Sequence, residues 1–145
     1  MILPDLNLLL YAYNPHAGPH ARARQWWEQT VNGRELIGLP HEVTLGFLRI
    51  ATNPRLGNAA VSLAAAKDVV AGWLDLPVVR VLLPRENHAE KVLALMERAG
   101  VSGQLASDAS LAVYAMDNRA TLCSNDADFI RFPGLSFVNP LLEPK

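Results

Sequence analysis

The sequence holds a single cysteine, Cys123, so no internal disulfide can form, and such scarcity is typical of a reducing compartment. No apolar run reaches the length that spans a membrane. Residues 1–5 lack a basic segment and are interrupted by the acid Asp5, which argues against a secretory signal peptide. We therefore expect a soluble protein of the cytoplasm, without a membrane anchor.

Several motifs of common enzyme classes are also missing. There is no glycine-rich phosphate loop, no His-Glu-x-x-His zinc helix and no Gly-x-Ser-x-Gly nucleophile turn. One cysteine cannot build a Cys-based zinc site, and His16, His20 and His88 do not stand at a metal-ligand spacing from one another. These absences leave side-chain carboxylates as the groups that could carry chemistry.

The apolar content is sufficient for one folded domain. Of the 145 residues 50% are hydrophobic and the formal net charge is -1, which argues against disorder and provides a core that needs no disulfide or metal. A charge this close to balance neither requires nor forbids a nucleic-acid partner. No repeat or long linker divides residues 1–145, and the loosest stretch, Gly57-Asn58, is too short to separate two domains. We expect a single domain.

Short apolar runs alternate with longer helical patterns, which is typical of parallel strands joined by right-handed helical crossovers. Strands are expected over Met1–Pro4, Glu35–Leu39, Pro77–Leu83, Ala120–Ser124 and Leu135–Val138. Helices are expected over Leu6–Tyr13, Pro19–Val31, Pro40–Thr52, Val61–Leu74, Asn87–Ala99 and Leu105–Asn118, with a helical turn over Asp126–Arg131. The expected fold is α/β, a three-layer α/β/α domain around a mainly parallel sheet.

Acidic residues follow the strands of this sheet, at the edge where ligands sit in such folds. Asp5 follows the first strand and Glu42 the second, Asp126 and Asp128 follow the fourth, and Asp108 lies in the first turn of the last long helix. Two such charges about 4 Å apart repel by roughly 4 kcal/mol at an effective dielectric of about 20. A divalent cation usually relieves this repulsion, and oxygen ligands select Mg²⁺ or Mn²⁺, which suit phosphodiester hydrolysis.

A plainer interpretation of the same acids stays open. Asp and Glu are favoured at helix N-termini, where they cap amide groups and complement the helix dipole. Helix starts lie at the same sheet edge, so Asp5, Asp108 and Asp126 are each compatible with a capping role alone. Their number weakens this interpretation without removing it, because clustered carboxylates destabilise a fold that binds no cation.

Other polar residues near these acids have weaker claims. Asn7 is either a capping group or part of the site, and Ser124 either orients Asp126 or simply ends a strand. Arg49 stands two helical turns after Glu42, where it could bind phosphate, although we favour a structural ion pair.

Structural roles are favoured for four further residues. His41, beside Glu42, could touch a phosphate, although we favour a surface residue at the start of a helix. Trp26 and Trp27 are expected in the core or an interface, and Cys123 is expected to be an inert core residue on an apolar strand.

The order and surroundings of the acids resemble the PIN domain and, more narrowly, the VapC toxin nucleases of toxin–antitoxin pairs. Four segments carry this resemblance over essentially the whole chain. They are Met1–Ala12 with its Asp-x-Asn, His41–Arg49, Leu105–Ala112, and Ala120–Phe129 followed by Phe132–Leu135. All four stand in the family's order, at matching spacing, in a chain of matching length.

The resemblance implies a metal-dependent endoribonuclease, the toxin of a type II toxin–antitoxin system, which uses Mg²⁺ or Mn²⁺ to hydrolyse RNA. It also implies a homodimer that a small VapB-like antitoxin inhibits. The implied catalytic residues are Asp5, Glu42, Asp108 and Asp126. The implied metal ligands are Asp5, Asp108, Asp126 and Asp128, with Asn7 and Ser124 in support. Whether Asp126, Asp128 or both reach the metal is left open.

Near-neutral charge is compatible with an RNA substrate. Leaving the five site acids out of the count raises the formal charge from -1 to +4, so the metal-bound surface could attract an RNA backbone.

A flap-type DNA nuclease would need arches or extra helices, for which the chain has little room. A PIN-like scaffold without a site is disfavoured by the intact acids. An aspartyl phosphatase would want Asp-x-Asp where this chain has Asp5-Leu6-Asn7.

Overall fold

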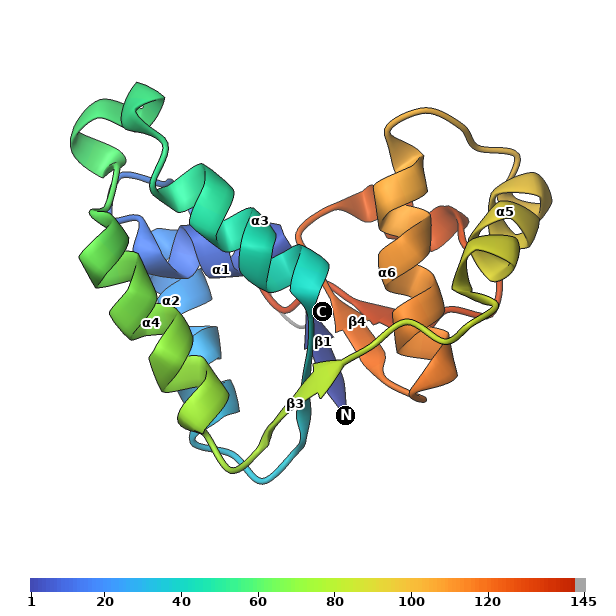
Figure 1. Cartoon of the computed structure of the whole chain (residues 1–145), viewed down its shortest axis with the longest axis horizontal. Helices are drawn as coiled ribbons and strands as arrows, with labels where there is room; N and C mark the ends of the chain where they lie inside the picture. Colours follow the sequence, from blue (N-terminus) through green and yellow to red (C-terminus); the bar gives the residue numbers. More distant parts are fainter. Residues whose placement is uncertain (143–145) are drawn as a thin grey trace.

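A computed structural model describes residues 1–142 of the chain (Figure 1). One five-stranded sheet has the strand order β3-β2-β1-β4-β5, and every neighbouring pair of strands is parallel. The strands are β1 (Ile2–Pro4), β2 (Ile37–Pro40), β3 (Val79–Leu82), β4 (Thr121–Cys123) and β5 (Phe137–Val138). The expected α/β fold with a parallel sheet is confirmed.

Helices cover both faces of this sheet and complete three layers. Figure 1 shows α1 to α4 on one side and α5 and α6 on the other. The helices are α1 (Leu6–Tyr13), α2 (His20–Val31), α3 (His41–Ala51), α4 (Leu63–Asp75), α5 (His88–Ala99) and α6 (Leu105–Asp117), with 3-10 segments η1 (Pro54–Ala59) and η2 (Ala127–Arg131). The bounds expected from the sequence are confirmed to within two residues.

The segment η1 is the element that the sequence interpretation missed. The Asn53 side chain accepts a hydrogen bond from the backbone N–H of Arg55 at 3.0 Å, and Pro54 supplies a preset backbone angle at the start. Gly57 then adopts a φ of 58°, which breaks the segment into two short turns. The sequence 53–58 therefore forms turns rather than an open loop.

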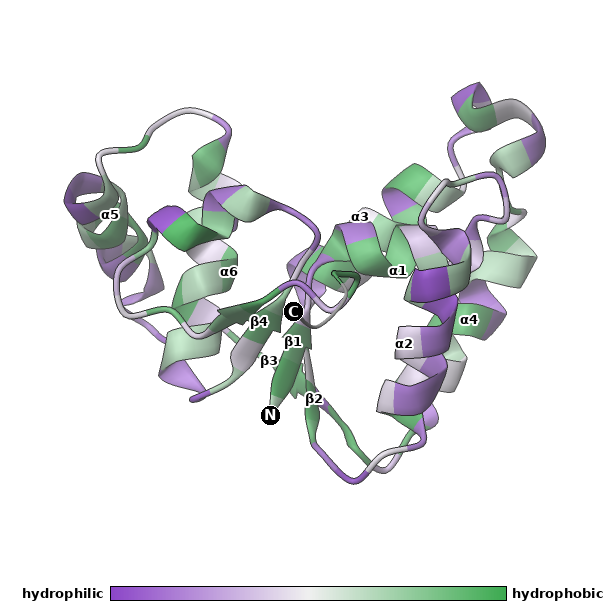
Figure 2. Cartoon of the chain, turned by 180° about the vertical axis from the view of Figure 1, so that it is seen from behind, coloured by the Kyte–Doolittle hydropathy of each residue, from purple (hydrophilic) through white to green (hydrophobic). Residues whose placement is uncertain are grey.

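The core lies between the sheet and its two helical layers. Leu3, Ile37 and Leu122 on the strands are fully buried, as expected for parallel strands covered on both faces. Figure 2 shows hydrophobic residues running along these strands, whereas the outer surface of α2 is polar. Burial raises the pKa of the Cys123 thiol to about 12, which fits the inert core residue expected.

Aromatic residues from α1, α2, α3 and α4 pack together in the core. The indole N–H groups of Trp27 and Trp73 both donate to the Tyr13 hydroxyl, at 3.1 and 2.9 Å. Phe47 packs edge-on against Trp73 with ring centroids 4.8 Å apart. Trp27 is therefore a core residue, as expected, and Trp26 packs half-buried beside it.

The carboxyl ends of β1, β2 and β4 meet at one edge of the sheet, where α1, α3 and η2 begin. Pro4 pairs with Cys123, and the Asp5 N–H donates to the Cys123 carbonyl at 2.8 Å. Gly46 lets α3 approach α1, because a Cβ there would come within 2.7 Å of the Leu6 side chain. Within residues 1–142, no helix is long and apolar enough to cross a membrane.

Candidate functional site

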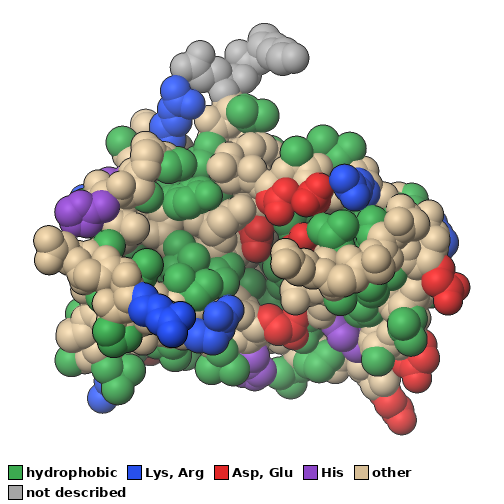
Figure 3. Space-filling view, turned by 90° about the horizontal axis from the view of Figure 1, so that it is seen from above, with side chains coloured by type: hydrophobic (Ala, Val, Ile, Leu, Met, Phe, Trp, Pro, Cys, Tyr) green, Lys and Arg blue, Asp and Glu red, His purple; other side chains and the backbone are tan. Residues whose placement is uncertain are grey.

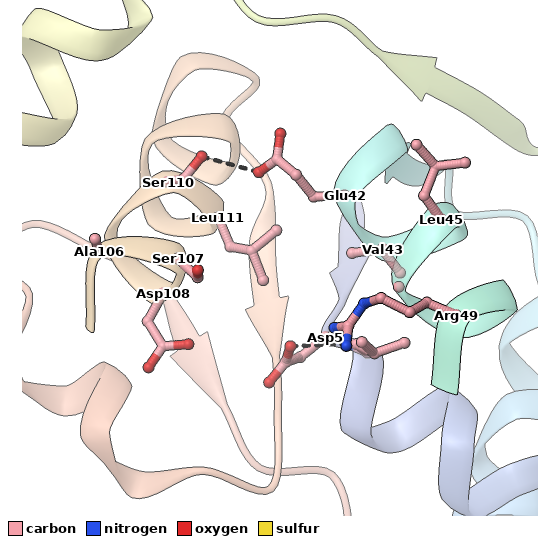
Figure 4. Close-up of a pocket in the computed structure, with 12 residues that line it drawn as sticks. Asp5, Glu42, Val43, Leu45, Arg49, Ala106, Ser107, Asp108, Ser110 and Leu111 are labelled. Carbon is pink, nitrogen blue, oxygen red and sulfur yellow. Dashed lines mark hydrogen bonds between the residues drawn. The ribbon is translucent and has the colours of Figure 1, made fainter. Parts of the chain in front are cut away.

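A cleft of about 630 Å³ opens at this edge between α3 and the first turns of α6 (Figure 4). Three of the acids expected at the site, Asp5, Glu42 and Asp108, line it together with Arg49 and Ser110. Figure 3 looks down on this face and shows acidic side chains gathered around a hollow, with basic side chains on either side. The cleft therefore joins residues that are far apart in the sequence.

Asp5 directly follows β1 and is buried, with 8% of the residue exposed. One carboxylate oxygen accepts the N–H of Leu6 at 2.7 Å and so caps α1, while the other accepts the Ser124 hydroxyl at 2.6 Å. Burial raises the pKa of Asp5; the bonds from Ser124 and Leu6 oppose the rise, and the charge of Asp126 adds to it. Asp5 therefore both caps α1 and lines the acidic cleft.

Ser124 is fully buried directly after β4, and its hydroxyl joins two strands of the site. It donates to Asp5 and accepts the backbone N–H of Asp126 at 2.9 Å and the side-chain amide of Asn7 at 3.2 Å. Ser124 therefore contacts Asp126 through the backbone, whereas the carboxylate that its hydroxyl holds belongs to Asp5. Asn7 also lies at the site, where its Oδ1 accepts the N–H of Asn125 at 3.5 Å.

Asp108, Asp126 and Asp128 form a carboxylate group in which one oxygen of each lies within 4.8 Å of the others. Asp126 caps η2, since its Oδ1 accepts the N–H of Asp128 at 2.9 Å. Asp128 is 3.5 Å from the guanidinium of Arg131, an exposed pair that offsets only part of the charge. The group stands at the junction of α6 and η2.

Asp108 differs from Asp5 and Asp126 because it caps no helix within residues 1–142. Its side chain accepts no hydrogen bond from any residue in 1–142, although it lies in the first turn of α6. Desolvation, followed by the charges of Asp5, Asp126 and Asp128, raises the pKa of Asp108 from 3.8 to about 6. The site therefore carries negative charge that its own hydrogen bonds leave unbalanced.

The donor set fits a hard divalent cation. All of its ligand atoms are carboxylate oxygens, the type that Mg²⁺ and Mn²⁺ prefer, and neither cysteine nor histidine belongs to the group within residues 1–142. A cation bound by these oxygens would also remove the repulsion that, after desolvation, adds to the raised pKa of Asp108.

Glu42 occupies the same cleft but stands apart from this group. It projects from the first turn of α3, and its two oxygens accept hydrogen bonds from the Ser110 hydroxyl at 2.9 Å and the Tyr114 hydroxyl at 2.7 Å. Figure 4 shows its carboxylate directed toward Ser110 on α6, while those of Asp5 and Asp108 face another part of the cleft. The structure therefore separates one acid from the other four.

Two partners of Glu42, Ser110 and Tyr114, were missed by sequence reasoning. They lie one helical turn apart on α6, so a pair of hydroxyls at this spacing beside Asp108 was the available signal.

The preference for a structural ion pair at Arg49 is wrong. Arg49 is exposed on the cleft wall, and it forms no ion pair with any residue in 1–142. His41 is exposed at the start of α3, as expected.

The fold and the acidic cleft define a class of α/β protein with a cluster of carboxylates at its sheet edge. The model of the PIN domain matches residues 2–135. Ribonuclease VapC33 of Mycobacterium tuberculosis is 41% identical over 143 residues, covering 99% of this chain and 100% of the relative. Ribonuclease VapC37 of the same organism is 32% identical, covering 97% of each chain. The chain belongs to the PIN-domain family and, within it, to the VapC group.

Solved structures share this fold. VapBC2 of Rickettsia felis, bound to a DNA fragment from its promoter, has a TM-score of 0.69 at 18% identity, covering 96% of this chain and 98% of the other. VapC20 of Mycobacterium tuberculosis, a toxin that cleaves the sarcin-ricin loop, also has a TM-score of 0.69 at 18% identity, covering 90% and 93%. At these identities the likeness concerns the fold.

Proposed function

We propose that the chain is the toxin of a type II toxin–antitoxin pair, a metal-dependent endoribonuclease of one domain that hydrolyses RNA phosphodiester bonds in the cytoplasm. The carboxylate group of Asp108, Asp126 and Asp128 beside the buried Asp5 is the observation that carries this proposal. It lies in a chain with full-length similarity to proteins named as ribonucleases.

In this proposal Asp108, Asp126 and Asp128 hold the cation, Mg²⁺ or Mn²⁺, with Asp5 as a further ligand. When bound, such an ion lowers the pKa of water and stabilises charge on the phosphate and the leaving oxygen. Ser124 and the Leu6 N–H hold the Asp5 carboxylate in one orientation, so it needs no rearrangement to take part.

Glu42 is the remaining acid of the cleft, and we assign the proton transfer to it. Both of its oxygens are held on the α6 wall, away from the carboxylates that would bind the cation. A carboxylate that stays free of the cation keeps a lone pair to accept a proton from attacking water.

Arg49 is the substrate-binding residue of this proposal. The guanidinium lies on the cleft wall without an ion-pair partner among residues 1–142, although acids line the same cleft. An arginine presents parallel N–H groups that match the oxygens of a phosphate. We place Arg49 on an RNA phosphate next to the cleaved bond.

A second copy and an antitoxin complete the proposed assembly. Leu63 and Leu74 on α4 are 70% and 49% exposed, so this helix presents apolar surface that a homodimer would cover. We expect expression of the chain alone to arrest bacterial growth, and co-expression of the adjacent reading frame to restore it. Growth without arrest, by a chain that cleaves RNA vigorously in vitro, would contradict the toxin assignment.

The activity itself is tested with purified protein and total cellular RNA. Discrete fragments should form in Mg²⁺ or Mn²⁺, disappear in EDTA and return when the cation is restored. A single-stranded DNA with the sequence of a cleaved RNA segment is the parallel substrate, and it should stay intact. Cleavage that continues undiminished in EDTA would refute the metal mechanism.

A further inference from the structure

Glu42 lies at the end of a chain of hydrogen bonds that links three helices. Tyr114 donates to Glu42 Oε1 at 2.7 Å, and Ser110 donates to Glu42 Oε2 at 2.9 Å. The Ser110 oxygen is in turn 2.8 Å from Nε2 of His88 on α5. Because Glu42 belongs to α3 and its two donors to α6, these bonds cross the cleft.

The direction of each bond in this chain follows from the donors available. A serine hydroxyl carries one hydrogen, and Ser110 donates it to Glu42, so its oxygen must accept from His88 Nε2. The opposite ring nitrogen, Nδ1, is buried and has no hydrogen-bond partner among residues 1–142. The pattern fits the neutral imidazole with hydrogen on Nε2, which makes His88 a fixed donor to Ser110.

Tyr114 is equally constrained. Its side chain is buried, and its ring packs against the His88 ring with centroids 4.4 Å apart. Burial and the neighbouring Glu42 carboxylate raise the pKa of the Tyr114 hydroxyl above its usual range, so it stays a donor at neutral pH.

This arrangement is unusual for an exposed glutamate. Ordering a solvent-accessible Glu side chain costs rotamer entropy, and an exposed carboxylate is normally satisfied by water. Here two protein hydroxyls from one helix hold both oxygens, and a third residue directs one of those hydroxyls. Released from them, the carboxylate could swing toward the cation site at the other side of the cleft.

We propose that Ser110 and Tyr114 are positioning residues for Glu42, and that His88 positions Ser110, so that Glu42 remains on the α6 wall as proton acceptor. The inference rests on the proposed function, because it assumes that Glu42 takes part in RNA hydrolysis. It adds three residues that act through Glu42 rather than as ligands of the cation.

The test is a double-mutant cycle on the purified protein in saturating Mn²⁺. Tyr114→Phe and Ser110→Ala should each lower kcat by about tenfold or more, with KM within a factor of about two, because ground-state RNA binding is untouched. In a Glu42→Gln background the same changes should lower kcat by less than about twofold, since the group they position is already inactive. Ser110→Thr and His88→Gln keep a hydroxyl and an N–H donor, and should retain most of the activity.

Tyr13→Phe is the matched control, because it also removes a tyrosine hydroxyl but at a residue that does not line the cleft. It removes the acceptor of two indole N–H groups, so it should lower the melting temperature while kcat stays at the wild-type value. Direct titration with Mn²⁺ should give Tyr114→Phe an affinity at least equal to that of the wild type, because the ligands are intact.

The outcomes separate this inference from the proposed function. Wild-type protein without metal-dependent cleavage, or Glu42→Gln with full activity, overturns the proposed function. If both behave as proposed, but Tyr114→Phe and Ser110→Ala keep the wild-type kcat or lower it equally in the Glu42→Gln background, the positioning network is refuted. The network is supported if Tyr114→Phe and Ser110→Ala lower kcat in the wild-type background but not in the Glu42→Gln background.

Discussion

Replacing Asp108 by Asn is the most informative perturbation of the carboxylate group. Asn has almost the same shape as Asp and removes only the charge. The Asp108 side chain accepts no helix N–H within residues 1–142, so the change removes no capping bond. Any effect on stability therefore reports the cost of the Asp108 charge in the fold, which comes first from desolvation and then from the charges of Asp5, Asp126 and Asp128.

The structure sets the size and sign of the effect. A pKa raised from 3.8 in the unfolded chain to about 6 in the fold corresponds to a cost of about 3 kcal/mol for the charged form, which comes first from desolvation and then from the neighbouring carboxylates. Because Asp108 is only partly buried, solvent screening reduces this to about 1 kcal/mol. A raised folded pKa means that the stability present below pH 3.8 is lost as pH rises through about 6. In EDTA at pH 7.5, the variant should therefore melt about 3 °C above wild type.

Thermal melts of both proteins in EDTA, from pH 5 to pH 8, measure this difference. The gap should shrink as pH falls below about 6, where folded wild-type Asp108 takes up its proton. Mg²⁺ at ten times its dissociation constant should stabilise wild type by roughly 1.4 kcal/mol and the variant far less, and RNA cleavage by the variant should fall by orders of magnitude. An active variant that melts below wild type in EDTA would refute the repulsive cluster.

Three further predictions concern the residues around the group and the assembly. Ser124→Ala should lower the free energy of unfolding by about 1–3 kcal/mol in a urea titration, because the buried Asp5 carboxylate loses its donor; an unchanged midpoint would contradict this role. Arg49→Gln should raise KM for RNA while kcat is kept, and should reduce the slope of log kcat/KM against log salt by about 1; an unaltered salt slope would exclude a phosphate contact. Light scattering at micromolar concentration should give a mass well above the 15.8 kDa of one chain, and a monomer would argue against the homodimer.

Much of the fold could be predicted because it follows from local patterns. The helix Leu6–Tyr13 was expected with the bounds that α1 has, since Asp5 precedes its apolar face and Asn14-Pro15 follows its last turn. The strands read as short apolar runs because both of their faces are covered. The turns of η1 were missed because a side-chain cap from Asn53 and a positive φ at Gly57 leave no periodic signal.

The sequence by itself determined which acids meet at one edge, because parallel strands bring their carboxyl ends together whatever the details of packing. It could not determine what each acid contacts. Glu42 and Tyr114 are 72 residues apart, and Ser124 and Asp5 are 119 apart, so their hydrogen bonds exist only through the packing of helices and strands. The tertiary structure therefore decided that Asp5 both caps α1 and lines the cleft, that Asp108 is left without a hydrogen bond from the described residues 1–142, and that Glu42 is held apart. These distinctions depend on distances of a few ångströms between distant segments, which no local pattern encodes.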